Sequence, residues 1–169
     1  MNNYLNKARD LSKLHHEGQM YGGNTYFHGH IVKVVDIGEL YEFPEEWVAA
    51  AYLHDILEDT DATISKDIFP VEVIEIVEAV TGVGSNRKER NKDIYSKINA
   101  LTKRGSYGAM AVKLADRIAN VEYSILHDGP HYDMYKKENT KFTKELYPKG
   151  DTKCPTYVYE LWILLKLKF

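Results

Sequence analysis

The chain has 169 residues, of which 44% are hydrophobic and 28% charged, the profile of a globular protein that buries a full core. Its net charge of −3 disfavours a role in non-specific nucleic-acid binding, because proteins with that role are usually basic. A single cysteine, Cys154, excludes an internal disulfide and fits a reducing, cytoplasmic location. We expect no secretory signal and no membrane span, since no apolar run has the pattern or length of either.

The predicted elements are helices almost throughout, because apolar residues recur at the helical spacing of three and four and strict alternation is rare. The first helix is expected over 2–17, from Asn2 onward, and Gly18 ends it. A loop rich in glycine and asparagine follows at 19–25. A second amphipathic helix is expected over 26–40.

Prolines precede several of the later helices. Pro44 suits the first turn of a helix that is expected to continue through Leu57, with Glu45 and Glu46 near its positive end. After a polar stretch, further helices are expected over 70–80, 87–102, 109–126, 132–146 and 157–168. No internal repeat and no low-complexity linker divides the chain, so we expect one domain over residues 1–169 with an all-α fold.

Four polar side chains lie in the otherwise apolar segment 49–59. His54 and Asp55 are followed one helical turn later by Glu58 and Asp59, which places them on one face if the helix is continuous. Three carboxylates and an imidazole on one patch resist burial. A divalent cation removes this conflict, and His and Asp side chains are suitable ligands for Mn, Fe, Zn or Mg. The alternative is an ordinary hydrogen-bonded His-Asp pair without a metal.

Two further segments favour the metal site. Histidines are concentrated ahead of the apolar segment, where His30 begins an amphipathic stretch and is the candidate second imidazole, with His28 as its rival. In the apolar helix expected over 109–126, Lys113, Asp116 and Asn120 share a face at spacings of three and four. The alternative there is a local Lys-Asp ion pair on a solvated stripe. Apolar residues cover most of this helix, which favours a lined cavity instead.

Together these segments resemble the HD-domain metal-dependent phosphohydrolases. More narrowly, they resemble the hydrolase domain of RelA/SpoT-type enzymes and their small stand-alone relatives. The similarity follows the chain in order, with HEGQ at 16–19 and a block around His30, then AAYLHDILEDT at 50–60, Val80-Thr81, and KLADRIAN at 113–120. The blocks at 50–60 and 113–120 are long, so the signal is more specific than a bare His-Asp pair.

The resemblance implies an all-α HD-domain helical bundle with a divalent metal ion, usually manganese in this family. The implied metal ligands are His30, His54, Asp55 and Asp116. The resemblance also implies that an acidic pair serves hydrolysis, in which a metal-activated water attacks phosphorus; the matching residues are Glu58 and Asp59. The implied substrate is a small-molecule nucleotide, typically guanosine tetra- or pentaphosphate, which loses its 3′-pyrophosphate.

Two departures from the family pattern affect the site. The interval from Tyr26 to His30 is one residue longer than the common spacing, and His30 is favoured over His28 because Ile31 and Val34 then keep the family's apolar positions. In the preceding loop, Tyr21 stands where family enzymes often place a basic residue that packs on guanine. A tyrosine can stack on a base but brings no charge.

Cations are expected around the reacting phosphate, because charge builds on its oxygens during transfer. Lys113 and Arg117 flank Asp116 and are candidate substrate contacts, and Asn120 matches a nucleotide-contacting asparagine of the family. Further basic residues lie in or beside the charged segment 87–102, where the alternative is a solvated helix face; they are Arg87, Lys88, Arg90 and Arg104.

Three other functions are weighed against guanosine polyphosphate hydrolysis. One is an HD-type nucleotidase or phosphatase that acts on another nucleotide or phosphate ester. Another is a protein that binds a nucleotide without cleaving it, which the intact pair Glu58 and Asp59 disfavours. A purely structural helical protein is disfavoured by the His-Asp-Glu-Asp patch. The sequence leaves the oligomeric state open.

Overall fold

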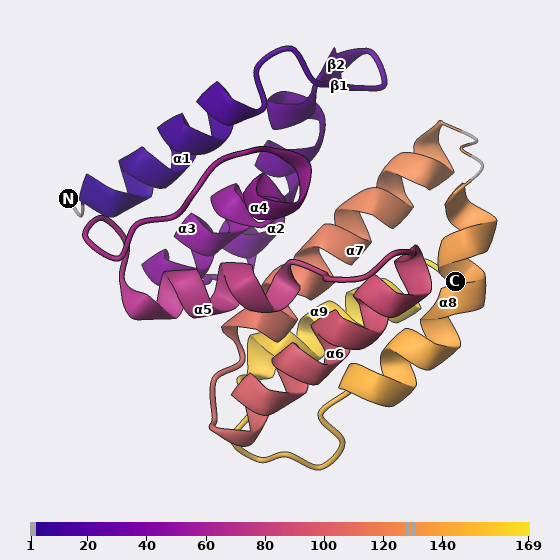
Figure 1. The fold of residues 1–169 in the computed structure, drawn as a ribbon. Helices are drawn as coiled ribbons and strands as arrows, with labels where there is room; N and C mark the ends of the chain where they lie inside the picture. The colour runs from indigo at the N-terminus through magenta and orange to yellow at the C-terminus, as the bar shows by residue number, and fades with distance from the viewer. Residues whose placement is uncertain (1–2, 128, 130) are drawn as a thin grey trace.

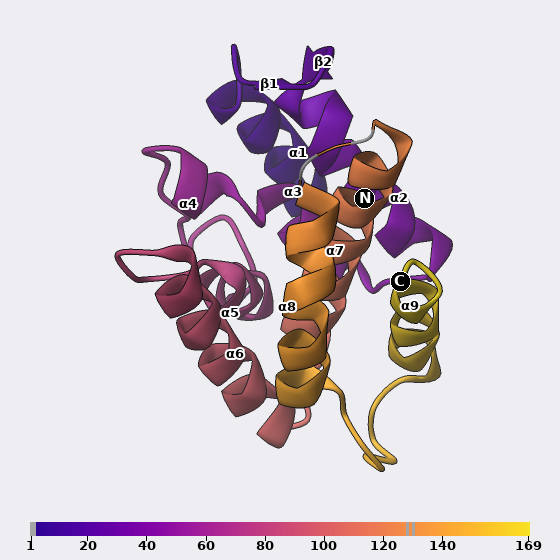
Figure 2. The same cartoon turned by 90° about the vertical axis from the view of Figure 1, so that its right-hand side faces the viewer.

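The computed structural model describes residues 3–127, 129 and 131–169, and these form a helical bundle around one central helix. That helix, α7 (Gly108–Leu126), contacts helices from both halves of the chain. The N-terminal helices lie on one side of it, and α8 (His131–Leu146) and α9 (Thr156–Lys166) each pack on it separately (Figures 1 and 2). The all-α prediction is confirmed for this part of the chain.

The N-terminal half supplies the remaining layers of the bundle. Helix α1 (Asn3–His15) packs on α3 (Glu45–Leu53), and α2 (Val32–Leu40) packs on both α3 and α7. Helix α5 (Val71–Val80) packs against both α3 and α7. Helix α6 (Arg87–Lys103) lies against α5, α7 and α8 (Figure 1). Within the described residues, no helix has both the length and the apolar character that crossing a bilayer requires.

Local sequence explains where several helices begin. Pro44, Pro70 and Pro155 stand directly before α3, α5 and α9, and the fixed φ of proline suits that position. Asn86 caps α6, because its side chain accepts a hydrogen bond from the backbone N–H of Glu89 at 3.0 Å.

A glycine allows the start of α7 to approach its neighbours closely. A Cβ atom at Gly108 would overlap the Ile76 side chain of α5 and lie 2.8 Å from the Trp47 indole nitrogen of α3. Residues 108 to 119 of α7 are almost all buried, so the helix is surrounded by apolar side chains along this length.

Three predictions about local structure are wrong. The expected loop at 19–25 contains a short antiparallel pair, β1 (Met20–Tyr21) with β2 (Asn24–Thr25). The expected helix over 26–40 is not α-helical throughout, since a π-helical turn, η1 (Phe27–Ile31), precedes α2. The helix that was expected to run through Leu57 breaks after Leu53 and resumes as α4 (Ile56–Asp59). The predicted start at Asn2 lies outside the described residues.

Candidate active site

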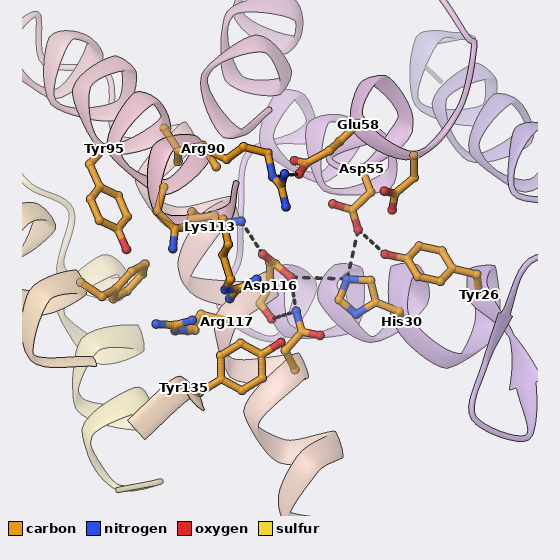
Figure 3. A pocket seen from close by; sticks show the side chains of 16 residues that line it. Tyr26, His30, Asp55, Glu58, Arg90, Tyr95, Lys113, Asp116, Arg117 and Tyr135 are labelled. Atoms are coloured by element: carbon orange, nitrogen blue, oxygen red, sulfur yellow. Dashed lines mark hydrogen bonds and ion pairs between the residues drawn. The ribbon is translucent and has the colours of Figure 1, made fainter. Parts of the chain in front are cut away.

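Four predicted metal ligands lie close together, and three of them, His30, Asp55 and Asp116, line one end of a polar cavity (Figure 3). His30 comes from η1, His54 and Asp55 from the break between α3 and α4, and Asp116 from α7. His30 Nε2 lies 3.1 Å from His54 Nε2, 3.3 Å from Asp55 Oδ2 and 3.4 Å from Asp116 Oδ1. Among the described residues, His30, His54 and Asp116 each offer a ligand atom within 4.8 Å of the other two.

The break after α3 orients His54. The His54 Nδ1–H donates to the Ala51 carbonyl of the last turn of α3 at 2.7 Å, because a carbonyl oxygen can only accept. In the neutral imidazole the lone pair is therefore on Nε2, the atom 3.0 Å from Asp55 Oδ2. His54 is 2% exposed, so its environment is dry and fixed. Asp55 still lies one helical turn before Asp59, whose backbone N–H donates to the Asp55 carbonyl at 2.9 Å, and both residues line the cavity.

The π-helical turn places Tyr26 and His30 in the same cavity. The backbone N–H of Val32 bonds to the carbonyl of Phe27, five residues earlier, so one extra residue is accommodated without shifting the flanking turns. The Tyr26 hydroxyl donates to Asp55 Oδ2 at 2.6 Å, and His30 is buried at 2% exposure. His28 is exposed, with its Nδ1 3.0 Å from Thr25 Oγ1, so of the two rival histidines only His30 faces the cluster.

Asp116 shares its two oxygens between different partners. Lys113 Nζ donates to Oδ2 at 2.8 Å, while Oδ1 faces His30 and accepts a short hydrogen bond from the Asn120 side-chain amide. Burial raises the pKa of Asp116, but the charge of Lys113 and the hydrogen bond from His30 outweigh it, so the net pKa is well below the usual range. The carboxylate is therefore held ionised in an interior position, as a metal ligand must be.

The donor set fits a divalent metal ion. The Nε2 atoms of His30 and His54 face each other at 3.1 Å. This contact alone does not satisfy the hydrogen-bonding capacity of both imidazoles. Burial lowers the pKa of His30, but Asp116 and Asp55 more than compensate and raise it to about 9. The same charges raise the pKa of His54. The cluster attracts positive charge at its centre, and imidazole nitrogens with carboxylate oxygens are ligands that Mn, Fe and Zn accept.

The two acidic residues of the predicted hydrolytic pair differ in their surroundings. Glu58 Oε1 pairs with Arg90 Nε at 3.2 Å, which holds Glu58 toward α6. Within the described residues no lysine or arginine forms an ion pair with Asp59, and burial, with the nearby charges of Asp55 and Glu58, raises its pKa. Both residues line the cavity. Asp59 is thus the better suited of the two to hold and release a proton.

The far end of the cavity is cationic. Figure 3 shows His30 and Asp55 on one side, Lys113 and Asp116 in the middle, and Arg117 beside Tyr135 on the other side. Glu138 of α8 connects two arginines at this end, because Arg87 Nε lies 2.7 Å from its Oε1 and Arg117 Nη1 lies 2.9 Å from its Oε2. The cavity has a volume of about 170 Å³, room for an ion, waters and a phosphoryl group.

The other predicted substrate contacts are distributed unevenly. Tyr21 does not line this cavity, and its hydroxyl donates instead to Asn120 Oδ1 at 2.8 Å. Asn120 does line it. Of the charged segment, Arg87 and Arg90 face the cavity, Lys88 is exposed, and Arg104 pairs with Glu75 at 3.2 Å on the outer face of α5.

Sequence reasoning missed the contribution of α8. Tyr135, Glu138 and Phe142 line the cavity or hold its arginines, and they lie on one face of α8 at spacings of three and four. That spacing was visible in the sequence, but nothing in it indicated that this face turns toward α7. The sequence pattern assigns no role to Tyr26, whereas in the structure its hydroxyl donates a hydrogen bond to Asp55.

Comparison with known proteins agrees with this geometry. The family model described as "HD domain" matches residues 8–141. A "probable guanosine-3′,5′-bis(diphosphate) 3′-pyrophosphohydrolase" of Mycoplasma pneumoniae is 31% identical over 129 residues, 69% of this chain and 18% of that protein. A guanosine-3′,5′-bis(diphosphate) 3′-pyrophosphohydrolase of Spiroplasma citri is 28% identical over 123 residues, 70% of this chain and 16% of that protein.

A solved structure shares the fold. The structure described as a metazoan ortholog of SpoT that hydrolyses ppGpp superposes with a TM-score of 0.71 at 19% identity, and the match covers 99% of this chain and 97% of that one. The chain spans less than a fifth of the length of the two curated bacterial relatives. The family model covers well over half of the chain and includes all four converging residues. The chain therefore belongs to the HD domain family.

Proposed function

We propose that this protein is a metal-dependent phosphohydrolase that removes the 3′-pyrophosphate from guanosine 3′,5′-bis(diphosphate) or its pentaphosphate analogue. The observation that carries the proposal is the convergence of His30, His54, Asp55 and Asp116 at one end of a cavity whose other end is cationic. The names of the bacterial relatives and of the structural neighbour support this substrate.

The four converging side chains would hold the metal ion, for which we propose manganese. When bound, the ion supplies Lewis-acid activation of the phosphate and of a water molecule. The chain's own contribution is to fix the ligands. Tyr26 orients Asp55, the Ala51 carbonyl fixes the His54 tautomer, and Lys113 keeps Asp116 ionised.

Asp59 would act as the general base and then as the general acid. Its pKa, raised by burial and by the charges of Asp55 and Glu58, favours taking a proton from the attacking water and returning it to the leaving oxygen. Glu58 would position Arg90 at the cavity wall through their 3.2 Å ion pair. Lys113 lies beside Asp116, where charge would develop on the oxygens of the reacting phosphate and a cation would stabilise the transition state of phosphoryl transfer, and Arg117 lines the same cavity.

Product analysis tests the proposal. The protein is incubated with guanosine 3′,5′-bis(diphosphate) and Mn²⁺, and we expect release of pyrophosphate and guanosine 5′-diphosphate. Release of orthophosphate alone would identify a phosphatase of the same family. Tight binding of the nucleotide without any product would identify a binding protein. Either result would overturn the proposed reaction.

Several narrower predictions belong to the same proposal. We propose that residues 1–169 form one HD-type phosphohydrolase domain, which the continuous buried core from α1 to α9 supports. A small-molecule nucleotide is the expected partner, and nucleic acid is not expected as one given the net charge of −3. A cytoplasmic location is proposed from the single, unpaired Cys154.

A further inference from the structure

Arg117 is buried with part of its hydrogen-bonding capacity unused. The residue is 6% exposed, and its guanidinium carbon lies 4.8 Å from the centre of the Tyr135 ring and 4.9 Å from that of Phe142. Nη1 donates to Glu138 Oε2 at 2.9 Å. Within the described residues, neither Nε nor Nη2 has a hydrogen-bond partner. The guanidinium is thus anchored at one nitrogen, packed against two rings, and unpaired at the Nε–Nη2 edge.

An unpaired buried guanidinium edge is costly, and an anion removes the cost. Buried N–H groups of a charged side chain without acceptors lose a large part of their solvation free energy. The Nε–Nη2 edge presents two parallel donors that match two oxygens of one phosphate group. Arg117 lines the cavity together with the ligand cluster, so an anion held there shares the cavity with the metal site.

The neighbouring cations are already engaged. Lys113 is paired with Asp116 at 2.8 Å and Arg90 with Glu58 at 3.2 Å. Arg117 lies beyond Lys113 and Asp116 as seen from the ligand cluster (Figure 3). A phosphate at Arg117 is therefore a second phosphate, separate from the one that reacts at the cluster.

We infer that Arg117 is the specificity-determining residue that binds the outer phosphate of a diphosphate group, and that Glu138 is the residue that positions it. The inference rests on the proposed function, because it assigns the second phosphate of the same substrate. It explains why Glu138 lies between Arg87 and Arg117: its carboxylate holds Arg117 by one nitrogen and leaves the Nε–Nη2 edge for the ligand.

Equilibrium binding in EDTA tests this inference without requiring turnover. Calorimetry compares guanosine 3′,5′-bis(diphosphate) with guanosine 5′-diphosphate 3′-monophosphate, which lacks only the outer 3′ phosphate. We expect the wild-type protein to prefer the first ligand, and Arg117→Gln to reduce that preference about 100-fold. Glu138→Gln, which keeps Arg117 but loses its anchor, is expected to reduce the preference about tenfold.

Lys137→Gln on the exposed face of α8 removes one positive charge and serves as the matched control, with no expected change in preference. If Arg117→Gln fails to fold, the ratio of the two affinities in Glu138→Gln tests the inference instead. Glu138 is partly exposed and its replacement is nearly isosteric, so this variant is expected to fold. An unchanged ratio of the two affinities in a folded Arg117→Gln, or in Glu138→Gln, would overturn the inference. Absence of hydrolysis with a retained preference would instead count against the proposed reaction alone.

Discussion

Three of the four proposed metal ligands are oriented by a hydrogen bond or ion pair from a residue outside the ligand set. Asp55 receives the Tyr26 hydroxyl at 2.6 Å, His54 donates to the Ala51 carbonyl at 2.7 Å, and Asp116 pairs with Lys113 at 2.8 Å. Such contacts fix the rotamers before an ion arrives, which raises affinity by lowering the cost of ordering the ligands. Replacing a ligand should therefore abolish metal binding without unfolding the bundle.

Asp55→Asn tests this at a single residue. We expect metal affinity to fall at least about 100-fold, because an amide oxygen is a neutral and weaker ligand. Helical content should be unchanged by circular dichroism. The matched control is Asp36→Asn, an exposed carboxylate that pairs with Lys33 at 3.8 Å, and it should bind metal as the wild type does. Equal metal affinity of the two variants would show that Asp55 is not a metal ligand.

Metal binding should depend on pH in a defined direction. In the metal-free cluster the pKa of His30 is raised to about 9, so below that pH the imidazole carries a proton that an incoming ion must displace. Affinity is therefore expected to rise by at least about tenfold per pH unit up to about pH 9, since displacing the proton of His54, whose pKa is also raised, steepens the dependence. Calorimetry in buffers of different ionisation enthalpy should detect proton release. Affinity independent of pH below about pH 9 would contradict this account.

At the scale of elements, two irregular turns build the site. The π-helical turn η1 accommodates one residue more than the common family spacing between Tyr26 and His30, and the break after α3 brings Asp55 to the cavity and His54 beside His30. Neither irregularity is predictable from hydrophobic periodicity, because periodicity reports the face of a regular helix and not its local winding. The extra residue was visible in the sequence, whereas its accommodation as a π turn required the structure.

Deletion variants distinguish the π turn from ordinary helix. Removing His28, which is exposed in η1, should convert the turn to α-helix and retain metal binding within about threefold. Removing Lys33, which is exposed within α2, should rotate the preceding residues by about 100° and withdraw His30 from the cluster. Metal titration of both proteins checks this. Loss of metal in the His28 deletion with retention in the Lys33 deletion would refute the proposed role of the π turn.

The start of α7 is a packing constraint at the same scale. A Cβ at Gly108 would overlap Ile76, so Gly108→Ala should lower the free energy of unfolding by about 1–3 kcal/mol. Urea denaturation measures this change. Gly23→Ala is the matched control, since a Cβ there meets no atom within 4 Å. Equal free energies of unfolding for the two variants would show that the contact between α5 and α7 adjusts to the added methyl group without a loss of stability.

For the whole molecule, helix positions were predictable and the assembly of the cavity was only partly so. Periodicity located α1, α5, α6, α7, α8 and α9 to within a few residues, and the polar residues in apolar segments marked His54, Asp55 and Asp116. The role of α8 was not predictable, because Tyr135 and Glu138 acquire it through long-range packing on α7. Local sequence pattern carries no information on which distant helix covers a given face.

The central claim is that four side chains from three parts of the chain bind one cation. Crystals grown with Mn²⁺ and measured at the manganese absorption edge test it most directly. The account predicts a single anomalous peak within coordination distance of His30 Nε2, His54 Nε2, Asp55 and Asp116. A fully occupied manganese peak elsewhere, with these side chains still in mutual contact and no density between them, would contradict it.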